Sequence, residues 1–429
     1  MNPMTRRRFL GAALPVVAGA SGMVRGWAAD AAKPTSLERI RGMMLGTFLG
    51  DALGGPIEFQ AREAIQKLEN PPKVWKDGEV LDAPAREAAA KRLVWRSYKE
   101  LRPKPESYGQ WNDFSERGTI TDDSRHKLVL LAALHRAAET KRLPMSVRDL
   151  AKAYLEWPEC PAMRSRPKYR ELAADWLEEW QFSARWVLGV RDEPWARPPE
   201  RMWNGIPTCC GQMTLPPVAA LYVGQPERAY RAAYQLAYFD NGFGRDMNAA
   251  LVAGLATALA TPMDPKSPRE AWETVLKSIR NTDPYGYGKI RWSTRAVHRW
   301  MELALNAARD SARQPARLFA VFDEQFRLNS KWEAQVPFVV TLGCLALAEY
   351  DPIAAWQLSL EWGWDTDSYA QMVGAFIGAL YGPGLFEASA KTAMLERLRA
   401  DVDVDLEAEC RFLDELNQQN RERPPVAEA

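Results

Sequence analysis

The sequence predicts an all-α fold, a single compact domain of about a dozen helices. Long stretches carry apolar residues at helical spacing, while no run of alternating β-branched residues is long enough to build a sheet. The chain has 429 residues, and 47% of them are hydrophobic, which is enough to fill a substantial core. The sequence also lacks the regular spacing of a repeat solenoid. These observations together favour one helical bundle.

The first predicted helix spans residues 36–53. Residues Thr35 to Glu38 have the pattern of a capping box, in which the two side chains satisfy free backbone N–H groups at the helix start. Glycines recur at four-residue spacing on one face of this helix, which allows another backbone to approach closely: Gly46, Gly50 and Gly54. The run Gly54–Pro56 then ends the helix and leaves Glu58 on a turn.

Residues 61–118 have the least regular pattern. They are charged, interrupted by prolines and longer than an ordinary connection, which indicates an insertion packed over the functional site. A short helix is expected within them at 86–101. A long helix follows from Asp122 to about residue 141, and its first turn carries two acidic residues, as the helix dipole favours.

The rest of the chain also predicts helices. Residues 143–235 are helical with proline-rich interruptions, and the last strong helix starts at Asp365 or Thr366 and again carries glycines every four residues. We assign residues 36–400 to the helical domain and residues 401–429 to a frayed tail, because the latter are acidic and polar. Four further helices are predicted in between: 247–259, 295–309, 315–326 and 336–349.

Two short acidic segments carry the strongest functional signal. Thr121–Ser124 (TDDS) and Asp365–Ser368 (DTDS) each offer two carboxylates and two hydroxyls at the start of a predicted helix. Oxygen-only clusters suit hard divalent cations, above all Mg²⁺. If the fold brings the segments together, four carboxylates converge, and cations are needed to neutralise their repulsion. Either segment alone has a simpler interpretation, because Asp, Ser and Thr are preferred helix N-cap residues.

A third segment, Gly50–Glu58 (GDALGGPIE), places these motifs in a known pattern. The order and spacing of GDALGGPIE, TDDS and WDTDSYAQMVGAFIGALYG (364–382) resemble the ADP-ribosylglycohydrolase family, which includes the dinitrogenase reductase-activating glycohydrolases. The resemblance extends over roughly residues 38–385. Where the family usually has threonine at the end of each acidic motif, this chain has Ser124 and Ser368, which keep the hydroxyl group.

The resemblance implies an orthogonal helical bundle with a centre of two Mg²⁺ ions, with Mn²⁺ as an alternative. Glu58 matches the early glutamate of the family, and we expect it to act as an acid/base or to position the substrate. Asp123 and Asp365 are further catalytic candidates, because a carboxylate near an anomeric carbon stabilises an oxocarbenium-like transition state. Asp51 is a candidate for either a structural or a functional role. The implied metal ligands are Thr121, Asp122, Asp123, Asp365, Asp367 and Ser368.

Two features bear on substrate contacts. The segment Asn204–Pro217 matches the family's central NG…MR…P pattern only loosely, since Thr214 stands where the pattern has arginine. The chain also contains 17 tryptophans, whose faces could stack on bases or sugar rings. Trp111, Trp203 and Trp364 are candidates to line a cleft, with Trp364 favoured because it adjoins Asp365. Core packing is the more usual role of tryptophan in a helical protein.

Composition argues against several other kinds of site. The 56 basic and 55 acidic residues nearly cancel, so the overall charge favours neither nucleic acid nor an anionic membrane as a partner. Three histidines (His126, His135 and His298) and scattered cysteines offer little material for a zinc site, and we expect His126 and His135 to be structural. The five cysteines show no disulfide spacing, so free buried thiols are expected, although an oxidising compartment would allow one or two bridges.

Residues 1–31 predict a twin-arginine signal peptide. Thr5–Leu10 (TRRRFL) matches the export pattern, an apolar stretch follows from Gly11 to Val24, and Ala28–Ala31 offers a cleavage site. The apolar stretch is too short and too rich in Gly and Ala for a stable membrane span. We therefore expect a periplasmic or otherwise exported protein that uses the twin-arginine machinery. An uncleaved anchor or a disordered basic tail is the alternative.

The leading functional hypothesis is an exported, Mg²⁺-dependent and monomeric glycohydrolase. Its substrate would be a small molecule or protein whose ADP-ribosyl group is held by an N- or O-glycosidic bond. Because ADP-ribosylation depends on intracellular NAD, a hydrolase of another ribosyl or glycosyl compound is an alternative. A non-catalytic, ligand-binding member of the same fold is the other. Four motif aspartates and Glu58 argue against it, because an abandoned metal site has no physical reason to keep carboxylates close together.

Overall fold

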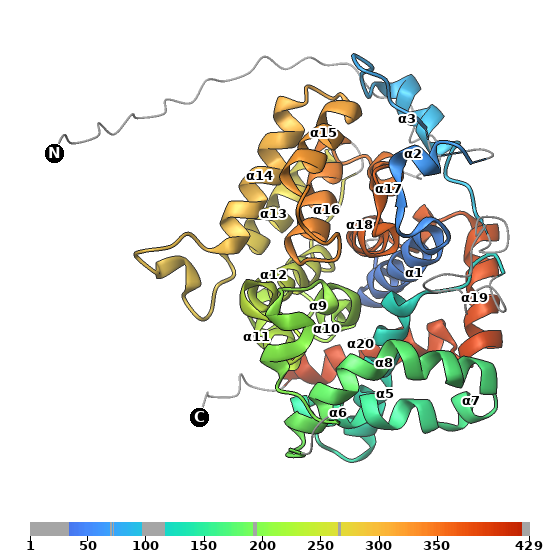
Figure 1. Cartoon of the computed structure of the whole chain (residues 1–429), viewed down its shortest axis with the longest axis vertical. Coiled ribbons are helices and arrows are strands. Elements are labelled where there is room, and N and C mark those ends of the chain that lie inside the picture. Colours follow the sequence, from blue (N-terminus) through green and yellow to red (C-terminus); the bar gives the residue numbers. More distant parts are fainter. Residues whose placement is uncertain are drawn as a thin grey trace.

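The predicted all-α fold is confirmed by the structure, a computed structural model of the chain (Figure 1). The predicted signal peptide, residues 1–31, lies outside the described residues. Across the described ranges, no helix has both the length and the apolar character that crossing a membrane requires. The structure describes residues 34–68, 71, 73–96, 116–191, 195–264 and 267–422.

The described residues form 19 α-helices, several of them of only four or five residues. Eight begin with proline in the first turn, where its missing N–H removes no helical hydrogen bond. The longer helices are α1 (Ser36–Gly54), α5 (Asp122–Glu139), α6 (Val147–Glu156), α8 (Pro167–Val187), α11 (Pro226–Leu236), α12 (Gly242–Ala258), α13 (Pro268–Asn281), α14 (Ala296–Asp310), α15 (Pro315–Gln325), α16 (Gln335–Leu347), α17 (Pro352–Glu361), α18 (Thr366–Tyr381), α19 (Ala388–Val402) and α20 (Leu406–Glu422). The short ones are α2 (Arg62–Ile65), α3 (Ala83–Ala90), α7 (Pro161–Arg164), α9 (Cys210–Thr214) and α10 (Pro216–Ala220).

Helices α1 and α18 form the central pair of the bundle. They run antiparallel with their glycine faces together, so closely that a Cβ atom on Gly46 would lie 1.9 Å from the carbonyl oxygen of Gly374. A Cβ atom on Gly42 would lie 2.1 Å from the carbonyl oxygen of Gly378. The predicted close approach is confirmed, and it sets the end of α1 beside the start of α18. In Figure 1 the pair lies between α13–α16 on one side and α5–α8 on the other.

The predicted frayed tail is wrong for residues 406–422. These residues form α20, which packs on α1 and buries Leu413 and Leu416. The guanidinium of Arg41 pairs with Glu407, and the Asn417 side chain accepts a hydrogen bond of 3.2 Å from the backbone N–H of Val223. The many charged residues between the leucines are the solvent face of an amphipathic helix, and they conceal its buried stripe in the composition.

The described part of segment 61–118 lies against the C-terminal half of the bundle. Strand β1 (Gln60–Ala61) pairs antiparallel with β2 (Gly363–Trp364), which directly precedes the second acidic motif. The Trp75 indole donates a hydrogen bond to the buried carboxylate of Glu361, and α3 packs on α17. The short helix α3 covers 83–90 and so overlaps the start of the helix expected at 86–101, of which residues 97–101 lie outside the described residues. That this segment is an insertion stays a prediction.

Candidate metal centre

Asp51, near the end of α1, holds the start of α5. Its carboxylate is fully buried and accepts hydrogen bonds of 3.1 Å from the backbone N–H groups of Thr121 and Ser124. The Thr121 hydroxyl donates a further bond of 2.5 Å to Asp51. Because the first N–H groups of a helix have no partner within the helix, a buried carboxylate there satisfies them and fixes the orientation of the motif. Of the two roles considered for Asp51, these contacts support the structural one.

The two acidic motifs meet directly, which is the condition for their carboxylates to form one cluster. The Thr366 hydroxyl donates a hydrogen bond of 2.8 Å to the carbonyl oxygen of Gly54, which attaches the start of α18 to the end of α1. In the same turn of α18, the Ser368 hydroxyl lies 3.2 and 3.3 Å from the two carboxylate oxygens of Asp123. The glycine-lined contact of α1 with α18 therefore brings the second motif onto the first.

Five carboxylates converge at this point in two groups of three. Oxygen atoms of Glu58, Asp365 and Asp367 lie within 4.8 Å of one another, and so do oxygen atoms of Asp122, Asp123 and Asp367. Asp367 belongs to both groups. Four of the five side chains are buried, and Asp122 is half-buried. The arrangement offers two adjacent cation sites that share one carboxylate.

The pKa values of the four aspartates in these groups are raised, chiefly because burial disfavours their charged form. Burial raises the pKa of Asp365 to about 7 and that of Asp122 to about 6. For Asp123 and Asp367 burial and then the neighbouring carboxylates raise the pKa well above its usual range. Asp367 Oδ2 is buried without a hydrogen-bond partner. An all-oxygen donor set with excess negative charge and a free buried oxygen fits a hard divalent cation.

The two hydroxyl residues of the predicted ligand set have protein partners. The Thr121 hydroxyl donates to Asp51 and accepts a bond of 3.2 Å from the backbone N–H of Asp123, so it caps α5. The Ser368 hydroxyl contacts Asp123. Both residues lie at the centre, but each set of three carboxylates is formed without them. Their role as ligands stays a prediction, as do the catalytic roles of Glu58, Asp123 and Asp365.

Lys127 is a charged residue of the centre that the sequence did not reveal. Its side chain is fully buried, and its ammonium group donates a hydrogen bond of 3.0 Å to the carbonyl oxygen of Asp123. Burial lowers its pKa, while Asp123, Asp51 and Asp367 act in the opposite direction. Lys127 therefore supplies positive charge close to the carboxylates. Its position four residues after Asp123, one helical turn, was the available signal.

Cys209 is a second residue that the sequence did not place here. Its sulfur lies 4.0 Å from Asp365 Oδ2 and 3.8 Å from the Ser368 hydroxyl oxygen. Burial, followed by the charge of Asp365, raises the pKa of Cys209 well above its usual range, so the thiol is neutral. The segment 204–217, which matches the family pattern loosely, thus lies beside the second acidic motif.

The tryptophan and histidine residues singled out in the sequence differ in where they lie relative to the centre. His126 is fully buried, hydrogen-bonded to the Tyr154 hydroxyl at 3.0 Å, and burial lowers its pKa well below the usual value, which agrees with a structural role. Trp203 packs against other tryptophan rings. Trp364 is half-buried beside Asp365 with a φ of +69°, so it remains the aromatic candidate nearest the centre. Trp111 lies outside the described residues.

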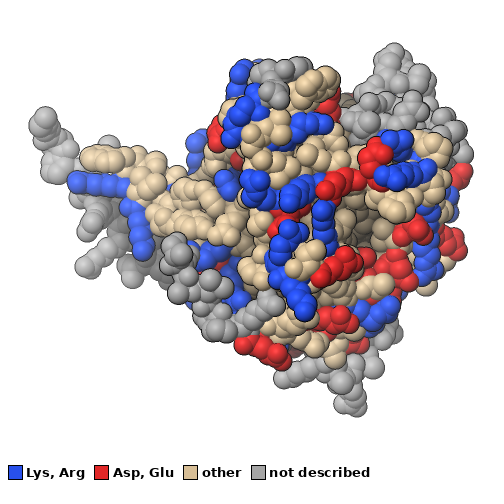
Figure 2. Space-filling view, turned by 90° about the horizontal axis from the view of Figure 1, so that it is seen from below, with Lys and Arg blue, Asp and Glu red and all other residues tan. Residues whose placement is uncertain are grey.

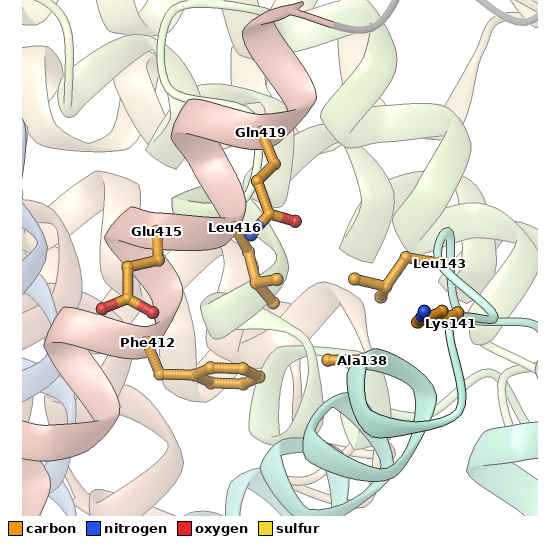
Figure 3. A pocket seen from close by; sticks show the side chains of 7 residues that line it. All are labelled: Ala138, Lys141, Leu143, Phe412, Glu415, Leu416 and Gln419. Atoms are coloured by element: carbon orange, nitrogen blue, oxygen red, sulfur yellow. The ribbon is translucent and has the colours of Figure 1, made fainter.

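A pocket elsewhere in the described residues is separate from this centre (Figure 3). It lies between the end of α5 and α20 and is lined by Ala138, Lys141, Leu143, Phe412, Glu415, Leu416 and Gln419. Because the acidic motif is at the start of α5, the 18 residues of the helix separate pocket and centre by about 27 Å. The pocket takes no part in the chemistry of the carboxylates.

Comparison with known families shows which family the chain belongs to. A sequence model of the family described as ADP-ribosylglycohydrolase matches residues 32–422. The chain belongs to the ADP-ribosylglycohydrolase family. Membership indicates a hydrolase of glycosidic bonds that depends on metal, and the buried carboxylate cluster can hold a metal ion. No significant match was found among curated proteins. The matched range includes α20, which agrees with its packing on α1.

Proposed function

We propose that this member of the ADP-ribosylglycohydrolase family is an exported, Mg²⁺-dependent enzyme that cleaves an N- or O-glycosidic bond at an ADP-ribosyl group. The observation that carries the proposal is the pair of carboxylate groups that share Asp367. Such a pair fits two ions rather than one, and Mg²⁺ rather than a softer metal, because the donors are carboxylate oxygens. The order of the motifs resembles the dinitrogenase reductase-activating type, which makes ADP-ribosyl-arginine the first substrate to test.

The chemistry can be assigned to groups of this chain. Bound divalent ions would supply Lewis acidity and hold the vicinal hydroxyls of the ribose. Asp122, Asp123, Asp365 and Asp367 would hold the ions, and Asp51 would keep the first two carboxylates in place. Water forms the new bond to the anomeric carbon as the glycosidic bond breaks, and the water's proton passes to the leaving group. Glu58, in the group with Asp365 and Asp367, is our candidate to transfer this proton.

The decisive experiment is hydrolysis in the presence of Mg²⁺ or EDTA. The substrates are ADP-ribosyl-arginine, ADP-ribosyl-serine, O-acetyl-ADP-ribose and simple ribosides. Metal-dependent release of ADP-ribose by the wild-type chain, and its loss in Asp122→Ala and Glu58→Gln, is the expected result. Asp77→Ala, at an exposed position, is the matched control and should remain active. Turnover of a riboside alone would indicate another glycosidase, and Mg²⁺ binding without any turnover would favour a non-catalytic member.

Export is the second part of the proposal, and it rests on Thr5–Leu10 and the apolar stretch that follows. We expect the protein in the periplasmic fraction of a host with twin-arginine export, as a monomer. Replacing Arg6 and Arg7 by lysine should retain it in the cytoplasm, while the same change at Arg25 should not. Periplasmic recovery of the Arg6→Lys/Arg7→Lys variant would contradict this part without affecting the assigned chemistry.

A further inference from the structure

The connection between α13 and α14 projects from the body of the molecule as an arm, which we define as residues 283–294 (Figure 1). The arm carries large apolar side chains in water. Trp292 is 85% exposed, Ile290 is 50% exposed and Tyr285 is 42% exposed. Every residue from 288 to 294 is exposed. Exposed apolar clusters of this kind are typical of surfaces that bind a membrane or another molecule.

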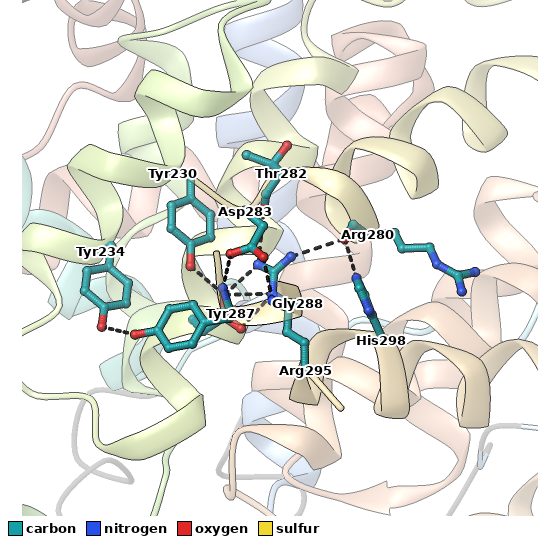
Figure 4. A network of polar contacts seen from close by, with 10 residues as sticks. Tyr230, Tyr234, Arg280, Thr282, Asp283, Tyr287, Gly288, Arg295 and His298 are labelled. Carbon is teal, nitrogen blue, oxygen red and sulfur yellow. Dashed lines mark hydrogen bonds and ion pairs between the residues drawn. The ribbon is translucent and has the colours of Figure 1, made fainter. Parts of the chain in front are cut away.

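The base of the arm is held in place by a polar network (Figure 4). The Asp283 carboxylate accepts bonds of 2.9 and 2.6 Å from the backbone N–H groups of Tyr287 and Gly288. Arg295 donates bonds of 3.2 and 2.9 Å to the carbonyl oxygens of Arg280 and Thr282, at the end of α13. These contacts hold the first turn of the arm and fix both of its ends to the bundle.

A buried ion pair anchors this network to the core. Arg295 and Asp246 on α12 lie 2.6 Å apart, with side chains 0% and 4% exposed. The Tyr230 hydroxyl donates a bond of 2.5 Å to the same carboxylate, and the Tyr287 and Tyr234 hydroxyls bond to each other. The arm is therefore built outward from a well-satisfied base, and its apolar tip does not fold back onto the protein.

The charge of the arm is one-sided, although the whole chain is nearly neutral. Beyond Asp283, whose carboxylate is bonded to backbone N–H groups at the base, the arm contains two basic residues, Lys289 and Arg291, and no acidic one. Lys289 and Arg291 flank Ile290, and the Arg291 guanidinium lies 4.9 Å from the centre of the Trp292 ring, so cation and indole are presented together. In Figure 2 the projecting part of the molecule shows basic and uncharged side chains on the visible face. The overall charge balance conceals this local cationic site.

We propose that the arm docks on an anionic lipid surface. The tip is convex, so it can bury Trp292 and Ile290 only by entering a concave partner or a deformable phase. Indole rings favour the membrane–water interface, and adjacent Lys and Arg side chains favour the phosphates of anionic lipids. Lys289 and Arg291 lie beside the apolar residues, which matches this layering. The arm would attach the enzyme to a bilayer peripherally, without a spanning helix.

The test is co-sedimentation of the full-length chain with lipid vesicles. We expect binding to vesicles of phosphatidylcholine mixed with phosphatidylglycerol, weaker binding to phosphatidylcholine alone, and weakening as salt is raised. Each cation near an anionic surface contributes about fivefold, so Lys289→Glu/Arg291→Glu should weaken binding at least about 25-fold. Trp292→Ser should also reduce it strongly. All variants share the same N-terminal segment, so the difference from wild type reports on the arm.

Matched controls make the same chemical changes elsewhere. Trp195→Ser removes another exposed tryptophan, and Lys91→Glu/Arg164→Glu reverses two exposed charges near α3 and on α7, on the far side of Figure 1 from the arm. These variants should bind like wild type. Arm variants that bind anionic vesicles like wild type would overturn the proposal, as would equal binding to neutral and anionic vesicles. Metal-dependent hydrolysis should be unchanged in all of them, which separates this test from that of the catalytic centre.

Discussion

Two buried polar sites in this protein differ in whether the chain's own groups satisfy their hydrogen bonds and charges. At the base of the arm, Asp246 accepts bonds from Arg295 and Tyr230, and the other donors of Arg295 reach backbone carbonyls. In the metal centre five carboxylates lie together, and Asp367 Oδ2 has no partner. Burying a charge is costly unless it is paired. A site that the chain satisfies is structural, whereas one left with excess charge indicates where a ligand binds.

The largest effect should follow from removing the carboxylate that both groups of the metal centre share. Asp367→Asn preserves the shape of the side chain but takes one ligand charge from each group. Mutating a residue that only hydrogen-bonds to a metal ligand typically lowers metal affinity roughly 10–100-fold. Because Asp367 is itself a proposed ligand, we expect a larger fall in Mg²⁺ affinity, measured by titration calorimetry. The metal-free variant should be more stable than the metal-free wild type, because repulsion is reduced. Unchanged affinity would show that the ions bind elsewhere.

Removing a charged group at the base of the arm should destabilise the protein, which is the opposite of the effect expected for Asp367→Asn in the metal-free protein. Arg295→Met leaves Asp246 buried without its cation, and breaking such a pair costs about 3–5 kcal/mol. Urea unfolding measures this loss. Arg295→Met with Asp246→Asn should recover part of it, because the uncompensated charge is gone. If Arg295→Met is neutral while Asp367→Asn destabilises the metal-free chain, the contrast between the two sites is wrong.

Features that depend on nearby residues were predictable from the sequence. The glycine spacing of α1 predicted a close approach by another backbone, although not that α18 would be the partner. The residue types of TDDS and DTDS predicted an oxygen-only cluster if the two motifs meet. Features that depend on the tertiary surroundings were not. Lys127 looks like any helical lysine until the packing buries it beside Asp123. Cys209 reaches Asp365 only through the path of the segment before α9.

Averaged composition and net charge also hid two structural features from the sequence-based predictions. The acidic and polar residues after 401 suggested a frayed tail, because their average composition hides the leucine stripe of α20. The near-zero net charge of the chain likewise hid the cationic arm. In both cases an average over the segment or chain removed a local pattern. Helix-period analysis of 406–422 would have found the first.

A third prediction concerns pH. The pKa of Asp122 is raised to about 6 and that of Asp365 to about 7, so the folded metal-free protein binds more protons than the unfolded chain between about pH 4 and 7. Its stability should therefore fall as pH rises through this range. The fall is about 1.4 kcal/mol per pH unit for each carboxyl group that stays protonated only in the folded state. Stabilisation by Mg²⁺ should grow over the same range, because the ions displace these protons.

Thermal unfolding with and without Mg²⁺ across this pH range measures both trends. Asp367→Asn should flatten them, since it removes one of the interacting carboxylates. Arg295→Met should lower the whole curve without changing the pH dependence of the Mg²⁺ effect, because Arg295 belongs to the other site. A Mg²⁺ effect that is constant from pH 5 to about 8 would contradict the raised pKa values of the centre.

The smallest effect, and the most specific, should come from Lys127. Its buried ammonium partly offsets the carboxylates, so it stabilises the metal-free centre but competes with divalent ions for them. Lys127→Met should therefore destabilise the metal-free protein and raise Mg²⁺ affinity, by on the order of tenfold if a weakly screened unit charge is removed. Lys91→Met, at an exposed site, should change neither quantity. Reduced Mg²⁺ affinity in Lys127→Met would instead assign Lys127 a positioning role, through its bond to the Asp123 carbonyl. In that case the centre would depend on Lys127 for its geometry and not for its charge.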